Sequence, residues 1–510
     1  MVSATALFLL GSLLGSEPCD VAPYFSPRWL ECEIQNALVA LENQTAQGSL
    51  MPEVAAATFA DQQARFAALA ADPERRPHPN SCSTGILCPV DPRLVHWADG
   101  AGLVEPVLYT SRSGATISGH VWATASGPAK RPGVVIINGS IVGYEEAYWY
   151  VAQALAKARF VVLTFDAQGE GASDQLGEAP DELEAAFAGI PVLGLLGPDT
   201  NLGGNGRPFY DGGTDALDFL VSTPAAPYVP RPSRTTGTSH AAKHERRVAE
   251  GRNAAFNPFW ELLDPEKIGV AGHSYGAVAA SWLGQSDPRL DAVVAWDDLC
   301  VPVWPSPDEF FAFGAAGAKY GGGYGLPTEC FGAPEGPAPA LVKPALAITA
   351  DYLAPSLYFA PPDPTLKSAA SLAYSAAGAD TGSIIVRGGN HLEFTDIPGA
   401  IPTSLRGIDL ATWYTAAWFT KYLLEDPAAD AMLLTTRWRD DARTAAVDPG
   451  KDANLFSWHY RSRLDVALAA GGRFVCENLR AGCEGQTDAA EDGGPADYSF
   501  VAVDTAPDTP

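Results

Sequence analysis

The fold is decided by the stretch KIGVAGHSYGAVAASWLG, at residues 267–284. Its first part is a short apolar run, as in a buried parallel strand, and its second part is rich in small residues that favour a helix. The pattern Gly-x-Ser-x-Gly joins the two parts, and glycines suit so sharp a turn because side chains would collide there. A strand, a tight turn and a helix in this order raise a serine hydroxyl above the sheet. We therefore predict that Ser274 is a nucleophile.

Apolar runs with strand character alternate with helical runs on both sides of this stretch. The expected strands are at 132–139, 160–166, 291–298, 344–351 and 383–391, with helices such as 213–223 and 409–426 between or after them. This alternation predicts an α/β fold with a doubly wound, mostly parallel sheet. Ligands bind such sheets at the carboxyl ends of the strands.

The chain divides into three regions by composition. Residues 1–100 are predicted to form an N-terminal helical extension, residues 101–440 the catalytic domain, and residues 441–510 an acidic C-terminal extension with little order. Two insertions, at 178–262 and 300–343, interrupt the catalytic domain after strand ends. They are expected to shape a substrate pocket, although surface decoration is the alternative.

Composition and charge exclude several classes of protein. Apolar residues make up 47% of the chain, too many for an intrinsically disordered protein. The 60 acidic and 33 basic residues give a net charge of −27, which would repel nucleic acids and anionic membranes. No run reaches the ~20 apolar residues of a membrane span. The run Val2–Gly15 has the length of the apolar core of a secretion signal, but no basic residue precedes it, and a buried helix is the alternative.

Eight cysteines favour an oxidising compartment. They fall into four sequence-neighbour pairs without zinc-ligand spacing: Cys19 and Cys32, Cys82 and Cys88, Cys300 and Cys330, Cys476 and Cys483. An even number outside metal spacing indicates disulfides, and neighbour pairing is one of about 105 connectivities. Together with the N-terminal apolar run, this predicts a protein that is secreted or lies on the exterior of the cell envelope.

A serine nucleophile needs a histidine base. The strand, elbow and helix around Ser274 resemble those of α/β-hydrolases, in which the base follows the serine and the acid along the chain. Only His391 and His459 follow Ser274. His391 is expected to be the base because it comes just after a strand, whereas His459 lies in a polar C-terminal segment. His273 is expected to shape the elbow.

The acid of the triad has two candidates from the residues alone. Asp297 ends the strand after the nucleophile helix, and Asp351 ends the following strand. Either carboxylate could hold the tautomer of the base. Asp298 is a third, weaker candidate, and the carboxylate that is not used would cap a helix or bind a loop.

Backbone N–H groups are expected to bind the oxyanion. One is that of Tyr275, directly after the serine, and the other belongs to the loop after the strand at 132–139. In that loop we favour the N–H of Ser140, with Ile141 next. No cluster with metal-ligand spacing and no phosphate-binding loop is found, so neither a metal nor an organic cofactor is expected.

Residues 104–426 resemble the α/β-hydrolase superfamily, and two subgroups within it. LDPEKIGVAGHSYGA, SDPRLDAVVAWDD and IIVRGGNHLEFTD resemble plasma-type platelet-activating-factor acetylhydrolases, which implies Asp297 as the acid. PALAITADYLAP and AAWFTKYLLED resemble cutinase-like polyester hydrolases and dienelactone-hydrolase-like esterases, which implies an acid near Asp351. ADYLAP is shorter than the loop that carries the acid in the second subgroup. The acid of that subgroup would therefore be expected nearer Leu353 than Asp351, and Asp297 is preferred as the acid.

The resemblance implies a serine carboxylester hydrolase that acts through an acyl-enzyme, without cofactors. Its substrate would be a lipid, a polyester or a small aryl or alkyl ester. An acyltransferase would use the same triad with an alcohol in place of water. A non-catalytic binding protein on a hydrolase scaffold is an alternative of a different class, and it would not need an exposed serine at an elbow.

Overall fold

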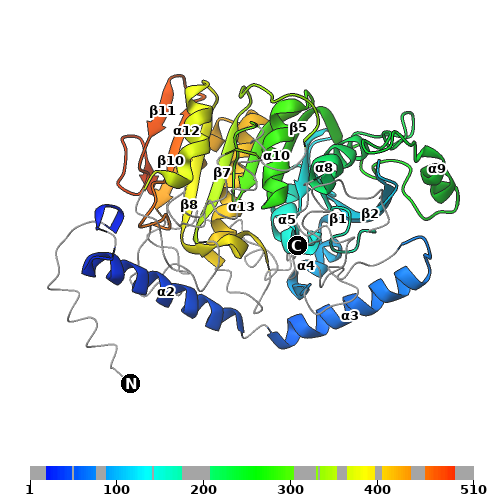
Figure 1. Ribbon diagram of the computed structural model, residues 1–510, viewed down its shortest axis with the longest axis horizontal. Coiled ribbons are helices and arrows are strands. Elements are labelled where there is room, and N and C mark those ends of the chain that lie inside the picture. Colours follow the sequence, from blue (N-terminus) through cyan, green and yellow to red (C-terminus); the bar gives the residue numbers. More distant parts are fainter. Residues whose placement is uncertain are drawn as a thin grey trace.

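A ten-stranded sheet forms the centre of the protein in the computed structural model (Figure 1). The strand order is β1-β2-β4-β3-β5-β6-β7-β8-β10-β11. The structure describes residues 19–23, 25–48, 51–75, 88–140, 143–174, 207–303, 329–330, 334–352, 364–396, 405–437 and 454–488.

The middle of the sheet is parallel and its two edges are antiparallel. Six strands run parallel to one another: β4 (Val161–Phe165), β3 (Arg131–Ile137), β5 (Leu263–His273), β6 (Leu290–Trp296), β7 (Ala345–Tyr352) and β8 (Thr381–Asn390). Antiparallel pairing adds β2 (Thr116–Thr124), β1 (Gly102–Thr110), β10 (Arg463–Ala467) and β11 (Arg473–Cys476). β9 (Thr435–Arg437) and β12 (Thr487–Asp488) form a separate two-stranded sheet. The predicted α/β class with a mostly parallel sheet is confirmed.

Helices cover both faces of the sheet. α5 (Trp149–Lys157) and α13 (Leu405–Tyr422) share one core with Val134 and Ile136 of β3. α8 (Arg207–Leu220), α10 (Tyr275–Ser286) and α12 (Ala369–Ala376) share the other core with Val135 and Ile137. Successive side chains of a strand point to opposite faces, so a continuous apolar strand requires a helix layer on each side.

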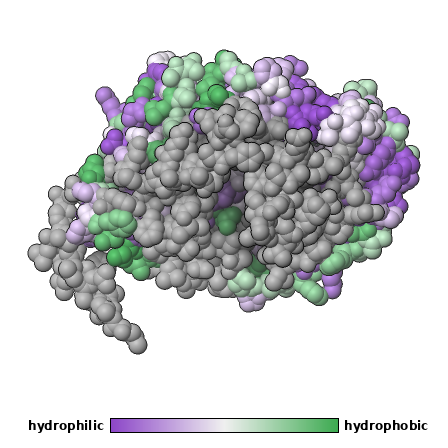
Figure 2. All heavy atoms as spheres, viewed as in Figure 1, coloured by the Kyte–Doolittle hydropathy of each residue, from purple (hydrophilic) through white to green (hydrophobic). Residues whose placement is uncertain are grey.

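The described residues form further helices and several 3₁₀ turns. They are α2 (Pro27–Gly48), α3 (Met51–Ala70), α4 (Pro92–Val95), α9 (Ala241–Ala249) and α14 (Ala428–Leu434), with 3₁₀ turns η1 (Cys19–Val21), η2 (Trp97–Asp99), η3 (Glu145–Tyr148), η4 (Leu366–Ser368) and η5 (His391–Phe394). α2 and α3 follow one another along one edge of the molecule (Figure 1). Both carry exposed apolar side chains, and hydrophobic surface is visible over each (Figure 2). In the part of the chain that the structure describes, no helix is long and apolar enough to cross a membrane.

α8 differs from the helix expected at 213–223, because it begins at Arg207 and ends at Leu220. The helix includes two adjacent glycines, Gly212 and Gly213, which lower intrinsic helix propensity. A Cβ on Gly213 would lie 2.6 Å from a methyl carbon of Leu283. Close packing of α8 on α10 thus outweighs the low propensity of its own residues.

Three of the four neighbour pairings of cysteines are confirmed. The disulfides Cys19–Cys32, Cys300–Cys330 and Cys476–Cys483 close short loops. Cys82 lies outside the described residues, as do the run Val2–Gly15, residues 178–206 of the first predicted insertion and most of the second. The rest of the first insertion contains α8 and α9.

Candidate active site

The strand register brings the candidate residues to one edge of the sheet. Ile137 of β3 pairs with Gly272 of β5, and His273 of β5 pairs with Trp296 of β6. The carboxyl ends of neighbouring parallel strands therefore lie side by side. Ser274 and Asp297, each the next residue after its strand, are neighbours for this reason.

Ser274 occupies a sharp turn between β5 and α10. Its backbone has φ 56° and ψ −121°, a left-handed conformation that non-glycine residues rarely adopt. Gly272 and Gly276 permit this turn: a Cβ on Gly276 would collide with the carbonyl oxygen of Ile137, and one on Gly272 with that of Gly276. The Ser274 N–H donates to the carbonyl oxygen of Trp296 at 3.0 Å, which holds the turn against β6. The Ser274 side chain is half-buried.

His391 and Asp297 form a short hydrogen bond. The distance from His391 Nδ1 to Asp297 Oδ2 is 2.6 Å, and the side chains are 17% and 7% exposed. Burial by itself would raise the pKa of Asp297, but the hydrogen bond and the charge interaction with His391 together lower this pKa below its usual value. An ionised Asp297 requires a proton on His391 Nδ1, so the lone pair of a neutral His391 is on Nε2.

Asp351 has different partners. Its Oδ2 accepts from the N–H of Gly388 at 2.7 Å and lies 3.5 Å from Nδ2 of Asn36 on α2. Burial raises the pKa of Asp351. These contacts tie the end of β7 to the end of β8, close to His391, and they bring the N-terminal helix against both strands.

Asp298 is the carboxyl group next to Asp297. Its Oδ1 accepts from the N–H of Leu299 at 2.7 Å and from Oγ1 of Thr349 at 3.1 Å. Burial and the neighbouring charge of Asp297 raise the pKa of Asp298 to about 7. Unlike Asp297, it therefore carries a proton for much of the time at neutral pH.

The loop after β3 lies against the elbow. A Cβ on Gly139 would be 3.3 Å from Cβ of Ser274, and the Gly139 N–H donates to the hydroxyl of Tyr148 at 3.2 Å. Ser140 follows directly and is half-buried. Tyr275 is the first residue of α10, where helix N–H groups have no acceptor within the helix. Ile141 lies outside the described residues.

Tyr148 and His273 complete the surroundings of His391, and sequence reasoning did not single out Tyr148. The hydroxyl of Tyr148 lies 2.8 Å from His273 Nδ1, and His273 Nε2 lies 2.7 Å from the carbonyl oxygen of His391. The rings of His273 and His391 are 4.7 Å apart. Tyr148 belongs to no sequence motif, so only its contact with His273 in the folded protein could have identified it.

His459, the alternative base, lies elsewhere. It is buried, its Nε2 lies 2.7 Å from Oε1 of Glu33, and its ring lies 6.0 Å from that of Trp29. Both partners belong to α2. The structure thus places His459 under the N-terminal helix and His391 beside the elbow.

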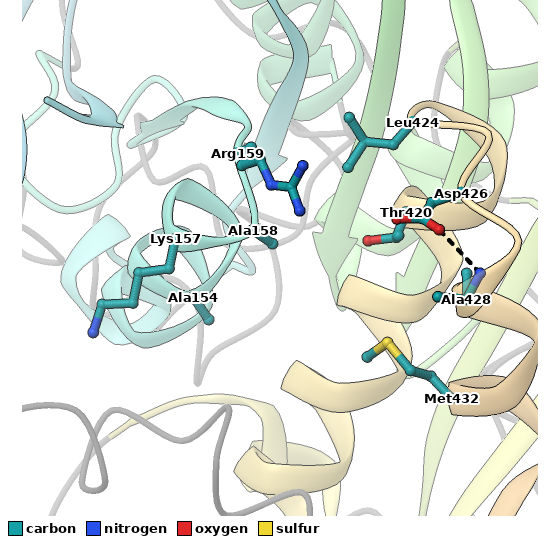
Figure 3. A pocket seen from close by; sticks show the side chains of 10 residues that line it. Ala154, Lys157, Ala158, Arg159, Thr420, Leu424, Asp426, Ala428 and Met432 are labelled. Atoms are coloured by element: carbon teal, nitrogen blue, oxygen red, sulfur yellow. Dashed lines mark hydrogen bonds between the residues drawn. The ribbon is translucent and has the colours of Figure 1, made fainter. Parts of the chain in front are cut away.

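Cavities elsewhere in the described structure hold none of these residues. One of about 330 Å³ lies between the end of α5 and the junction of α13 and α14. In Figure 3, Arg159 faces this space opposite Asp426, whose carboxylate accepts from the N–H of Ala428 at 3.0 Å. Another, of about 610 Å³, lies between α3 and the edge strands and is lined by His120 and Trp149 among others. Among the described residues, no group of three His, Cys, Asp or Glu could hold a metal ion.

No protein-family model matches the chain, and no curated protein matches it. A functional proposal therefore has to stand on the geometry of the site. That geometry consists of an elbow serine, a short histidine–aspartate hydrogen bond beside it, and a loop packed closely on the serine.

Proposed function

We propose that the protein is a secreted serine carboxylester hydrolase with an α/β-hydrolase fold. The observation that carries the proposal is the 2.6 Å hydrogen bond between His391 and Asp297, beside a serine in a strained turn from strand to helix. Strained backbone concentrates at functional sites, and Asp297 is also left-handed, with φ 44°. The chain order serine, aspartate, histidine agrees with that of α/β-hydrolases.

Each group has a role in acyl transfer. Ser274 attacks the ester carbonyl carbon while Nε2 of His391 takes the hydroxyl proton. Asp297 keeps the Nδ1 proton in place and stabilises the imidazolium. The N–H groups of Tyr275 and Ser140 stabilise the oxyanion. The alcohol leaves with the proton from His391, and a water molecule, deprotonated by His391, then releases the acid.

Asp297 is proposed as the acid of the triad. Asp297 contacts His391 directly, whereas Asp351 binds the backbone of Gly388. A carboxylate can stabilise the imidazolium only from within hydrogen-bond reach of its ring. Asp351 is therefore assigned a structural role, in which it holds the loop that carries His391.

Secretion is proposed from the disulfides. The three that the structure describes persist in oxidising compartments and are rare in the reducing cytosol. Tethering of Cys19 to Cys32 also fixes the start of α2, the helix that packs on the loop of His391.

The proposal is tested with p-nitrophenyl esters of increasing acyl chain length. Wild type, Ser274→Ala and Ser286→Ala are compared, because Ser286 is an exposed serine at the end of the same helix. Turnover that is lost in Ser274→Ala and retained in Ser286→Ala supports the serine mechanism, and the chain-length profile measures the pocket. Turnover that persists in Ser274→Ala contradicts it.

The same assay separates the two alternatives. Addition of a primary alcohol diverts the acyl group to a new ester if the enzyme is an acyltransferase, and product analysis detects that ester. A folded wild type without turnover on any ester or acceptor favours a binding protein on the same scaffold.

A further inference from the structure

Tyr148 and His273 connect the loop after β3 with the loop that carries His391. The N–H of Gly139 donates to the Tyr148 hydroxyl oxygen at 3.2 Å. That hydroxyl lies 2.8 Å from Nδ1 of His273, and Nε2 of His273 lies 2.7 Å from the carbonyl oxygen of His391. Consecutive hydrogen bonds thereby join the segment after β3, the last residue of β5 and the segment after β8.

The direction of these hydrogen bonds is determined by their two ends. A carbonyl oxygen only accepts and a backbone N–H only donates. His273 must therefore carry its proton on Nε2, and the Tyr148 hydroxyl must donate to Nδ1. Burial, and then the neighbouring ring of His391, lower the pKa of His273 to about 3, so His273 is neutral and both of its ring nitrogens are used.

Both side chains are removed from solvent. Tyr148 is 1% exposed and His273 is 2% exposed. The ring of Tyr148 stacks on that of Trp296 at 6.1 Å and 6°, and Trp296 directly precedes Asp297. Side chains buried this deeply cannot touch a substrate, so any role that they have in catalysis is exerted through other groups.

We propose that Tyr148 and His273 are positioning residues, which hold the backbone of His391 at a fixed distance from the Gly139–Ser140 loop and so align the base with the oxyanion site. This inference rests on the proposed function, because it assumes the roles of His391 and of the loop. Loss of the Tyr148 hydroxyl removes the hydrogen bond that Nδ1 of His273 accepts, and with it a contact that holds the imidazole ring in place. The ring can then tilt, which weakens its hydrogen bond to the carbonyl oxygen of His391.

The first test is Tyr148→Phe, which removes a single oxygen atom. Tyr414→Phe is the matched control, since Tyr414 is also buried and its hydroxyl donates to the carbonyl oxygen of Thr435 at 2.9 Å, far along the chain from the site. We expect kcat to fall ~10–100-fold in Tyr148→Phe, because displacement of a reacting group by about 1 Å can cost roughly 100-fold. KM should stay within about twofold, as neither residue binds the substrate.

The second test compares His273→Gln with His273→Leu. A glutamine amide can still donate to the carbonyl oxygen of His391, whereas leucine can neither donate nor accept. We expect His273→Gln to retain at least about ten times the kcat of His273→Leu, which corresponds to one hydrogen bond of ~1.4 kcal/mol. Equal kcat values for two folded variants would overturn the inference.

The third test does not depend on activity. In ¹⁵N NMR spectra of the wild type, His273 should be the Nε2–H tautomer and should not titrate between pH 5 and pH 9. In Tyr148→Phe, the low-field resonance of the His391 Nδ1 proton should shift, since its bond to Asp297 is realigned. A titrating His273, or the Nδ1–H tautomer, would overturn the inference even if Tyr148→Phe failed to fold.

The two proposals fail in distinguishable ways. Full activity of Ser274→Ala would refute the serine mechanism, whatever the state of His273. A dead Ser274→Ala together with wild-type kcat and an unchanged His391 resonance in Tyr148→Phe would refute the positioning role alone.

Discussion

Replacement of Asp297 by asparagine tests the pairing on which the proposed mechanism depends. Asn has nearly the same shape but no charge, so the variant leaves His391 without an anion when it takes the proton of Ser274. The 2.6 Å bond places the charge centres of carboxylate and imidazolium about 4 Å apart, where an effective dielectric constant of ~20 gives about 4 kcal/mol. At ~1.4 kcal/mol per factor of ten, Asp297→Asn should lower kcat about 1,000-fold.

The assay measures initial rates on the p-nitrophenyl ester that the wild type hydrolyses fastest. Asp351→Asn is the matched control, because Asp351 is an equally buried aspartate at the end of the adjacent strand. The asparagine carbonyl can still accept from the N–H of Gly388, so kcat should change by less than ~10-fold. Circular dichroism and thermal unfolding show whether each variant is folded.

Two results would refute this reasoning. If folded Asp297→Asn keeps more than a tenth of the wild-type kcat, the charge of Asp297 does not stabilise the imidazolium. If Asp351→Asn loses as much activity as Asp297→Asn, the second carboxylate contributes to catalysis in a way that its contacts with Gly388 and Asn36 do not explain.

Three further predictions concern the surroundings of the site. Asp298→Asn should raise the Tm at pH 8 by at least about 2 °C and leave the Tm at pH 4 nearly unchanged. The pKa of Asp298 is raised to about 7 in the folded protein, so ionisation of Asp298 removes stability as the pH rises from the unfolded pKa near 4 to 7. An equal gain in Tm at both pH values would contradict this. Gly139→Ala should lower kcat ~10–100-fold, because the added methyl group would press on His273 and Ser274. Gly100→Ala is the control and should leave kcat unchanged, because no atom lies within 4 Å of the new Cβ. Equal kcat values for the two variants would show that the loop after β3 moves to accommodate the methyl group. The double variant Cys300→Ala/Cys330→Ala, which opens a disulfide across 30 residues, should lose about 3–4 kcal/mol in urea unfolding, and an unchanged midpoint would refute the disulfide's contribution.

Much of the fold follows from local patterns. Continuous apolar strands such as Arg131–Ile137 are buried on both faces, and that requirement is visible in the composition of a short run. The elbow is similarly local, because the glycines at 272 and 276 and the flanking strand and helix are close in sequence. By contrast, the helical conformation at Gly213 is accompanied by close packing of α8 against Leu283, which no local propensity encodes.

The sequence did not determine which aspartate is the hydrogen-bond partner of His391. Asp297 and Asp351 each lie at the carboxyl end of a parallel strand, so both satisfy the same local description. Only the path of the chain at the end of β8 determines which of them His391 reaches. Gly388, in the left-handed conformation with φ 67°, turns that segment so that its N–H meets Asp351 and His391 meets Asp297.

The sequence by itself therefore determined the α/β class, the nucleophile candidate Ser274 and the histidine expected to serve it. These depend on periodicity, on turn chemistry and on chain order, all of which act over short distances or along the chain. The tertiary structure alone decided the partner of His391 and revealed Tyr148 beside His273. Hydrogen bonds between loops far apart in the sequence depend on distances of a few tenths of an ångström, which arise only when the strands are aligned in register and the helices are packed on them.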